Sequence, residues 1–406
     1  MKNKNRWIDF SILALCMVGL LGLLLRSKIV FELPLINYNH LLEGHSHFTF
    51  GGWVSLALMT SLVLELLPPS VNQKYYYQWL LGGIAISSWG MLLAYLLEGY
   101  GYFSIICSFI FILITYVFGY VFTRDVVKTD LPKPIVLLAV SSIICLVLSS
   151  FGIFIIAYIY FTKSFEAILY RDALFTYLHF QYNGFFSLSI FALLFKLMDN
   201  NILQTARKNA GRFAVLLCIS IIPSLFLSYL WQDPNKWFWV IAITGSLLLL
   251  LCCILLILTL RQLHKAYLQE IPVIRFLIFI SMSSFLLKIF LQCFTIFPVI
   301  GNAIFGNRPI IMGFLHLVFL AFTTLFILAF FTRKGWLDGT KKFTIIALIV
   351  FTIAITCNEI VLLIQGLANI LLAGSNLFAW LLWIIGICLF IGTMLIGIAR
   401  IKTSKI

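Results

Sequence analysis

Twelve long apolar runs restrict what this chain can fold into more than any other feature of its sequence. Each run is long enough to cross the hydrocarbon core of a bilayer, which is about 30 Å thick and takes roughly 20 helical residues. Backbone groups cannot be left without hydrogen bonds in lipid, so runs of this kind cross as α-helices. The predicted spans are residues 7–25, 45–67, 79–97, 102–122, 135–160, 174–197, 213–231, 237–260, 272–297, 310–331, 343–363 and 378–398. The expected fold class is an all-α polytopic membrane protein.

Composition supports this class, because 62% of the residues are hydrophobic and only 10% are charged, a balance too apolar for a soluble domain. The connections are short, so residues 1–406 are expected to form a single transmembrane domain of twelve helices. No small-x-small cleavage pattern follows the first run, which indicates a retained span rather than a signal peptide. The nine cysteines contain no Cys-x-x-Cys pair, which argues against zinc ribbons, c-type haem and a disulfide framework.

Basic residues predict the orientation, because Lys and Arg are retained on the cytoplasmic side of short loops. With the N-terminus inside, the inner segments carry 21 of the 28 Lys and Arg residues. The outer loops carry six, Arg26 and Arg308 among them. Both termini are therefore expected to be cytoplasmic, in a protein of a prokaryotic cytoplasmic membrane. The net charge of +14 then reflects topology and anionic lipid, and it requires no nucleic-acid partner.

Four of the six histidines fall near the outer ends of three spans that run in the same direction. His45 and His47 begin span two, His179 lies in span six and His316 in span ten. Ligation of a metal or haem needs nitrogen donors that converge from different helices. Each imidazole taken alone could instead bond a carbonyl of a neighbouring helix. The shared depth of the four residues favours a common cofactor.

Local geometry limits how these residues could act. Residues i and i+2 of a helix point about 200° apart, so His45 and His47 cannot ligate one metal together. One is expected to be a ligand and the other to face a second group, and the deeper His47 is preferred as the ligand. Tyr182 lies three residues after His179 and is expected to share its face. Its hydroxyl could donate a proton or hold a bound oxygen ligand, which makes Tyr182 the candidate catalytic residue.

The twelve spans, the cytoplasmic N-terminus and the histidines on spans two, six and ten resemble subunit I of the haem–copper oxidases. In that family span two supplies a low-spin haem ligand, span six a copper ligand and span ten a pair of haem ligands. The resemblance covers the whole topology, although its motifs are short. It implies that His45 or His47 is a haem ligand, His179 a copper ligand and His316 one member of the span-ten pair.

The sequence also departs from that family. Span seven, FAVLLCISIIPSLFLSYLW, lacks the His-His pair that completes the copper site, and LHLVF on span ten offers one histidine where two are expected. The resemblance therefore implies a reduced ligand set without a complete binuclear centre. The His-x-His at the start of span two is also similar to the NnrS family, which comprises twelve-span haem- and copper-containing membrane proteins tied to nitric-oxide stress.

Two cofactor arrangements follow from these imidazoles. A haem b between spans two and ten would take two opposed nitrogens as axial ligands, with Arg308 as a cation for its propionates. Alternatively, copper or non-haem iron held by His47, His179 and His316 would keep an open position for oxygen or nitric oxide. Either arrangement predicts a redox protein, an oxidoreductase of the haem–copper type if it is an enzyme, supplied with electrons by quinol or a cytochrome.

A different class stays open, a twelve-span secondary transporter without a cofactor. Such transporters bind substrate near the membrane midplane and often contain two similar halves, and no such repeat is evident here. Two ionisable residues, Lys288 and Glu359, lie deep in spans nine and eleven. Buried charge in a membrane usually marks a pathway or an ion pair. They are expected either to bridge the two spans or to relay protons.

Overall fold

The structure is a computed structural model that describes residues 2–164, 166–198, 203–232, 234–304 and 306–404. Within these ranges the chain forms helices and no strand, and twelve helical segments are long and apolar enough to cross a membrane. The prediction of an all-α polytopic membrane protein is confirmed. Nine spans centre on one α-helix each: α1 (Lys2–Val30), α5 (Tyr75–Glu98), α6 (Tyr102–Val126), α7 (Lys133–Thr162), α10 (Leu203–Leu225), α11 (Lys236–Gln262), α13 (Pro272–Phe294), α17 (Lys342–Ile370) and α18 (Leu377–Ser404).

The other three spans, numbers two, six and ten, are each interrupted by a π-helical segment. These spans are α2 (Tyr38–Phe48), η1 (Thr49–Ser55) and α3 (Leu56–Leu66); α8 (Ala167–His179), η2 (Phe180–Phe186) and α9 (Ser187–Leu197); and α15 (Arg308–His316), η4 (Leu317–Thr324) and α16 (Leu325–Arg333). Each segment begins within two residues of a histidine. π-Helices are rare and concentrate at functional sites. The three segments next to the histidines are therefore the part of the bundle in which to look for a site.

Spans two, six and ten are also the inner helices of the bundle. Of their most apolar stretches 78%, 94% and 78% is buried, against 56% or less for the other spans. The outer spans instead leave large apolar side chains exposed, as expected where helices face lipid. The protein is therefore an integral membrane protein whose histidine-bearing helices are enclosed by the rest of the chain.

The helices repeat one packing pattern in groups of four. α1 packs against η1 and α5, α7 packs against η2 and α10, and α13 packs against η4 and α17. The first helix of each group thus contacts the second and the third. No repeat was predicted from the sequence, and the three groups share a packing pattern and the position of a histidine.

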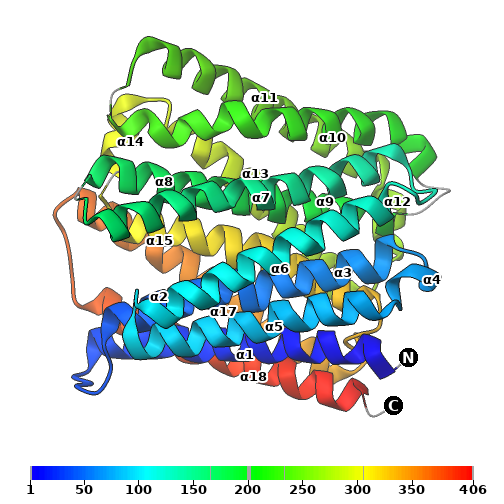
Figure 1. Cartoon of the computed structure of the whole chain (residues 1–406), viewed down its shortest axis with the longest axis horizontal. Coiled ribbons are helices and arrows are strands. Elements are labelled where there is room, and N and C mark those ends of the chain that lie inside the picture. The colour runs from blue at the N-terminus through cyan, green and yellow to red at the C-terminus, as the bar shows by residue number, and fades with distance from the viewer. Residues whose placement is uncertain (1, 165, 199–202, 233, 305, 405–406) are drawn as a thin grey trace.

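Both termini lie at the same end of the bundle, and α2, α8 and α15 begin at the opposite end (Figure 1). We call this opposite end the far end. Three short helices complete the chain: α4 (Pro69–Asn72), α12 (His264–Gln269) and α14 (Pro298–Ile304). α10 continues towards the far end as a 3₁₀ segment, η3 (Phe226–Gln232).

Several spans extend beyond their predicted boundaries, and two of these extensions bear on the candidate site. Span two begins at Tyr38 rather than at residue 45, because the Asn37 side chain caps the helix by accepting from the amides of Asn39 and His40. His45 therefore lies about two turns inside the helix. Span one continues to Val30, so Arg26, predicted in an outer loop, belongs to the transmembrane helix α1.

Candidate cofactor site

His45 and His316 form the centre of the candidate site. His45 lies on α2, and His316 is the last residue of α15. The two rings are close enough to interact electrostatically. The Nδ1 atom of each is buried and has no hydrogen-bond partner. A buried nitrogen without a partner costs about 1–3 kcal/mol, and this pair of unsatisfied nitrogens makes His45 and His316 the candidate site.

Close helix packing positions the first of these rings. A Cβ added at Gly22 of α1 would lie 3.5 Å from the His45 Cε1 atom, which is ordinary van der Waals contact. The absence of a side chain at Gly22 lets α1 and α2 approach closely on the side where the imidazole lies. His45 is thereby directed towards α1 and His316.

Arg26 adds a cation beside the two rings, and it interacts electrostatically with both of them. Its guanidinium donates to the carbonyl oxygen of Leu382 at 2.5 Å and to the Oδ1 atom of Asn358. The Asn358 amide in turn donates to Glu359 at 2.9 Å. Arg26 is thus held by α17 and α18, with its charge near Glu359 and next to His45 and His316.

Arg308 lies above this site at the far end of the bundle. It is exposed, it donates to the Tyr38 hydroxyl, and its guanidinium carbon is 5.4 Å from the centre of the Tyr38 ring. Tyr38 begins α2 and Arg308 begins α15. The contact therefore joins the far ends of the two helices that carry His45 and His316.

His47 points away from His45, as the spacing predicted. Its ring stacks on Tyr95 of α5 with the centroids 4.3 Å apart, and its Nε2 shares a hydrogen bond of 3.2 Å with the Tyr100 hydroxyl. The structure thus brings His45, and not the preferred His47, to His316. Which way each ring faces depends on the rotation of α2 about its axis, which packing against α1 and α5 fixes.

His179 has both ring nitrogens in hydrogen bonds. Asn183 Nδ2 donates to Nδ1 at 2.9 Å, and Nε2–H donates to the carbonyl oxygen of Ile221 at 2.8 Å. Ile221 lies two residues before Pro223, which interrupts the hydrogen-bond ladder of α10. The arrangement is that of a fully satisfied core histidine that ties span six to span seven.

This arrangement makes a stability prediction. Asn183→Ala is expected to lower the free energy of unfolding by about 1–3 kcal/mol, because it leaves the buried Nδ1 of His179 without a donor. Thermal unfolding of the purified protein in mild detergent measures the change. Asn376→Ala at an exposed position is the matched control, and equal unfolding temperatures for the two variants would contradict the prediction.

Tyr182 was expected to share the face of His179, but the two side chains contact different helices. The Tyr182 ring packs on Phe314 of α15, with centroids 5.9 Å apart, and the Lys288 ammonium of α13 lies 5.6 Å from its centre. The π-helical segment η2, which begins directly after His179, changes the angular spacing that an α-helix would give. Tyr182 thus lies beside Phe314 and Lys288, and its catalytic role stays a prediction.

The histidines do not gather into one metal site. Over the residues that the structure describes, no three His, Cys, Asp or Glu side chains lie together as they would to hold a metal ion. His47, His179 and His316 are therefore not brought together as a set of three. Among the predicted ligands, His45 and His316 are the two that interact with each other.

The fold and these contacts define an integral membrane protein of twelve spans with polar clusters buried between its inner helices. Comparison with known proteins finds no matching family model and no matching curated protein. Any functional conclusion therefore depends on the geometry of the site.

Proposed function

We propose that the protein is a membrane-embedded redox protein related to subunit I of the haem–copper oxidases. In this proposal His45 and His316 are the axial ligands of a b-type haem between spans two and ten. One observation carries it: the two spans to which the resemblance assigns haem ligands each carry a histidine with a buried Nδ1 atom that has no hydrogen-bond partner, and the two histidines interact electrostatically. A haem held by two imidazoles supplies one-electron transfer.

The surrounding residues fit such a group. Arg26 and Arg308 present positive charge within and above the site, where the carboxylates of a haem would need cations. Gly22 leaves α1 without a side chain against His45. Asn358 and the Leu382 carbonyl hold the Arg26 guanidinium in place. In this proposal His45 and His316 supply the ligands and the two arginines supply the counter-charges.

The proposal favours electron transfer over binding of a diatomic ligand. Two histidine ligands fill both axial positions of a haem, so no position remains for oxygen or nitric oxide. The nitrogens of His179, the residue expected to bind copper, are occupied by Asn183 and the Ile221 carbonyl. A quinol or a cytochrome would supply the electrons.

Purification in mild detergent followed by iron and copper analysis and a reduced-minus-oxidised spectrum tests the proposal. We expect a b-type haem signal that His45→Ala and His316→Ala each abolish, because each removes one axial ligand. His47→Ala and His179→Ala are expected to keep it, and the exposed His264 provides the matched control, His264→Ala. Imidazole added to the His316→Gly variant should restore the signal.

Two outcomes would overturn the proposal. Folded wild-type protein without haem would exclude it and leave the cofactor-free transporter as the alternative. A haem signal that survives both His45→Ala and His316→Ala would show that other residues hold the haem. Loss of the signal in His47→Ala alone would instead return the ligand role to the residue that the sequence favoured.

A further inference from the structure

Lys288 is a buried cation that the proposed haem site does not use. It lies in the second half of the transmembrane helix α13, and only 2% of its surface is exposed. Two other deeply placed cations have polar partners: Arg26 donates to Asn358 and Leu382, and Arg400 donates to Asp9 and the Trp336 carbonyl. Within the described ranges no hydrogen bond or ion pair reaches the Lys288 ammonium.

The groups around Lys288 do not neutralise its charge. Its nitrogen lies 5.1 Å from the centre of the Phe285 ring and 5.6 Å from that of Tyr182. The titratable neighbours that interact with it are the thiols of Cys253 and Cys293 and the His179 ring. None of these is a carboxylate. A buried ammonium without a counter-charge is costly in a membrane interior, and an anion would remove that cost.

An unpartnered acceptor lies one helical turn towards the far end. Gln292, four residues after Lys288, shares its helix face and is 7% exposed. Its Oε1 atom is buried without a hydrogen-bond partner. A donor at Lys288 and an acceptor at Gln292 are thus left open side by side. A group that bridges the two side chains must accept from the ammonium and donate to Oε1, and an oxyanion that carries a hydroxyl does both.

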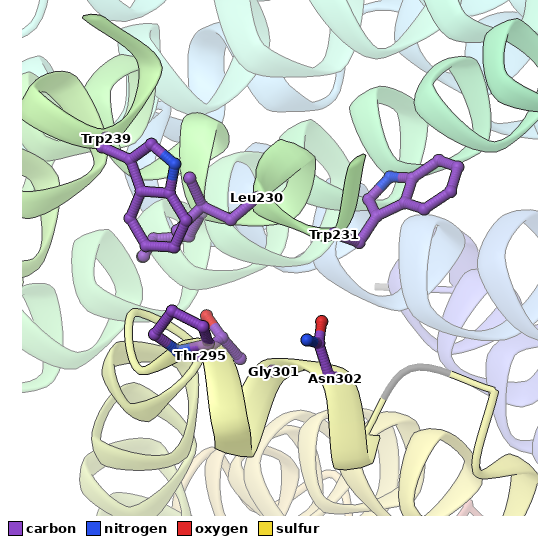
Figure 2. Close-up of a pocket in the computed structure, with 8 residues that line it drawn as sticks. Leu230, Trp231, Trp239, Thr295, Gly301 and Asn302 are labelled. Carbon is purple, nitrogen blue, oxygen red and sulfur yellow. The ribbon is translucent and has the colours of Figure 1, made fainter. Parts of the chain in front are cut away.

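A cavity of about 220 Å³ lies beyond Gln292 at the far end. Thr295, one turn further along the same chain, lines it together with Trp231 and Trp239, and Figure 2 shows the two indoles across the cavity from Thr295, Gly301 and Asn302. The Trp231 indole donates to Asp172 at 3.2 Å. The cavity therefore has a fixed wall, and its lining residue Thr295 lies three residues after Gln292.

We propose that Lys288 and Gln292 bind a small monovalent oxyanion that carries a hydroxyl, of the size of hydrogencarbonate, which enters through this cavity. The Lys288 ammonium donates to a charged oxygen of the anion, and the anion's hydroxyl donates to Gln292 Oε1. Two hydrogen bonds of about 2.8 Å each span the turn between the two side chains. The site is separate from His45 and His316, and it does not depend on the proposed function.

Isothermal titration calorimetry of the purified full chain in detergent, at constant pH and ionic strength, tests the site with sodium hydrogencarbonate and sodium nitrate. Nitrate is planar and of similar size but has no hydroxyl, so hydrogencarbonate is expected to bind more tightly. Lys288→Met should weaken hydrogencarbonate binding about 10–100-fold, the worth of a charge-assisted hydrogen bond. Gln292→Leu should reduce the preference for hydrogencarbonate over nitrate about 3–10-fold, because it removes the acceptor for the anion's hydroxyl.

Controls separate this site from the haem site. Lys265→Met, at an exposed position of α12, should bind as the wild type does. His316→Ala should also keep hydrogencarbonate binding, even where it abolishes a haem signal. Wild-type protein that binds neither anion would overturn the proposal, as would equal binding by Lys288→Met. If Lys288→Met does not fold, the Gln292→Leu variant still tests the proposal. An unchanged preference of that variant for hydrogencarbonate over nitrate would overturn it.

Discussion

Arg26→Met is expected to lower the free energy of unfolding by about 3–5 kcal/mol, the cost of breaking a buried polar pair by removing one partner. The guanidinium of Arg26 is the donor for Asn358, which is fully buried, and for the Leu382 carbonyl. It is also the positive charge that acts on Glu359. Methionine has a similar length and no charge, so it would leave the buried Oδ1 atom of Asn358 without a donor and Glu359 without its counter-charge.

Thermal unfolding in detergent, combined with a double-mutant cycle, measures this effect. Glu359→Gln in the Arg26→Met background should recover part of the loss, because it removes the carboxylate that Arg26 no longer compensates. Arg261→Met is the control, since Arg261 is exposed at the end of α11. Wild-type unfolding behaviour in the Arg26→Met variant would disprove the buried network as a source of stability.

Arg26 also shows where sequence reasoning reached its limit. A basic residue at the end of an apolar run normally marks the membrane boundary, so Arg26 was predicted in an outer loop. Its partner Asn358 lies 332 residues away in the chain. No local pattern connects the two residues, and only the packing of spans one, eleven and twelve makes Arg26 part of the bundle interior.

The spans themselves could be predicted because the signal is local. Twelve runs of apolar residues are each long enough to satisfy their own backbone hydrogen bonds in lipid, and the structure has twelve helices of that kind. The histidine-bearing spans were also located correctly. The three π-helical segments were not predicted, because η1, η2 and η4 share no residue pattern that indicates a π-helical turn.

The candidate site was predicted only in part, for the same physical reason. Helix geometry required His45 and His47 to diverge, and they do. The rotation of α2, however, follows from contacts with other helices, with Gly22 on one side and Tyr95 on the other. Depth alone favoured His47, while the tertiary contacts place His45 beside His316.

Glu359 and Lys288 were expected to pair with each other or to carry protons, and the structure separates them. Glu359 accepts from Asn358 and interacts with Arg26, whereas Lys288 lies among Tyr182, Phe285 and two thiols. The two charges therefore belong to different clusters. One cluster is internally compensated, and the other has an open donor and an open acceptor.

The second large effect is expected at Gly152 on α7, where Gly152→Ala should destabilise the fold by about 3 kcal/mol, the upper end of ordinary overpacking. The added methyl group would lie 2.8 Å from the backbone nitrogen of Tyr177 and would also meet the Ala173 carbonyl oxygen. Both contacts are backbone atoms of α8, so no side-chain rotation can relieve them and the helix itself must move. His179 lies two residues after Tyr177, and its bond to the Ile221 carbonyl is expected to weaken with that movement.

Gly211→Ala provides the matched control in another transmembrane helix, α10. A Cβ at Gly211 would approach only the Pro134 side chain, at 3.6 Å, so the same substitution should be neutral or stabilise the helix by up to about 1 kcal/mol. Thermal unfolding of both variants, together with their yield in the membrane fraction, measures the contrast. Equal stability of the two variants would show that α8 adjusts to the added methyl group without cost, and that His179 is not held by the close packing of α7 and α8.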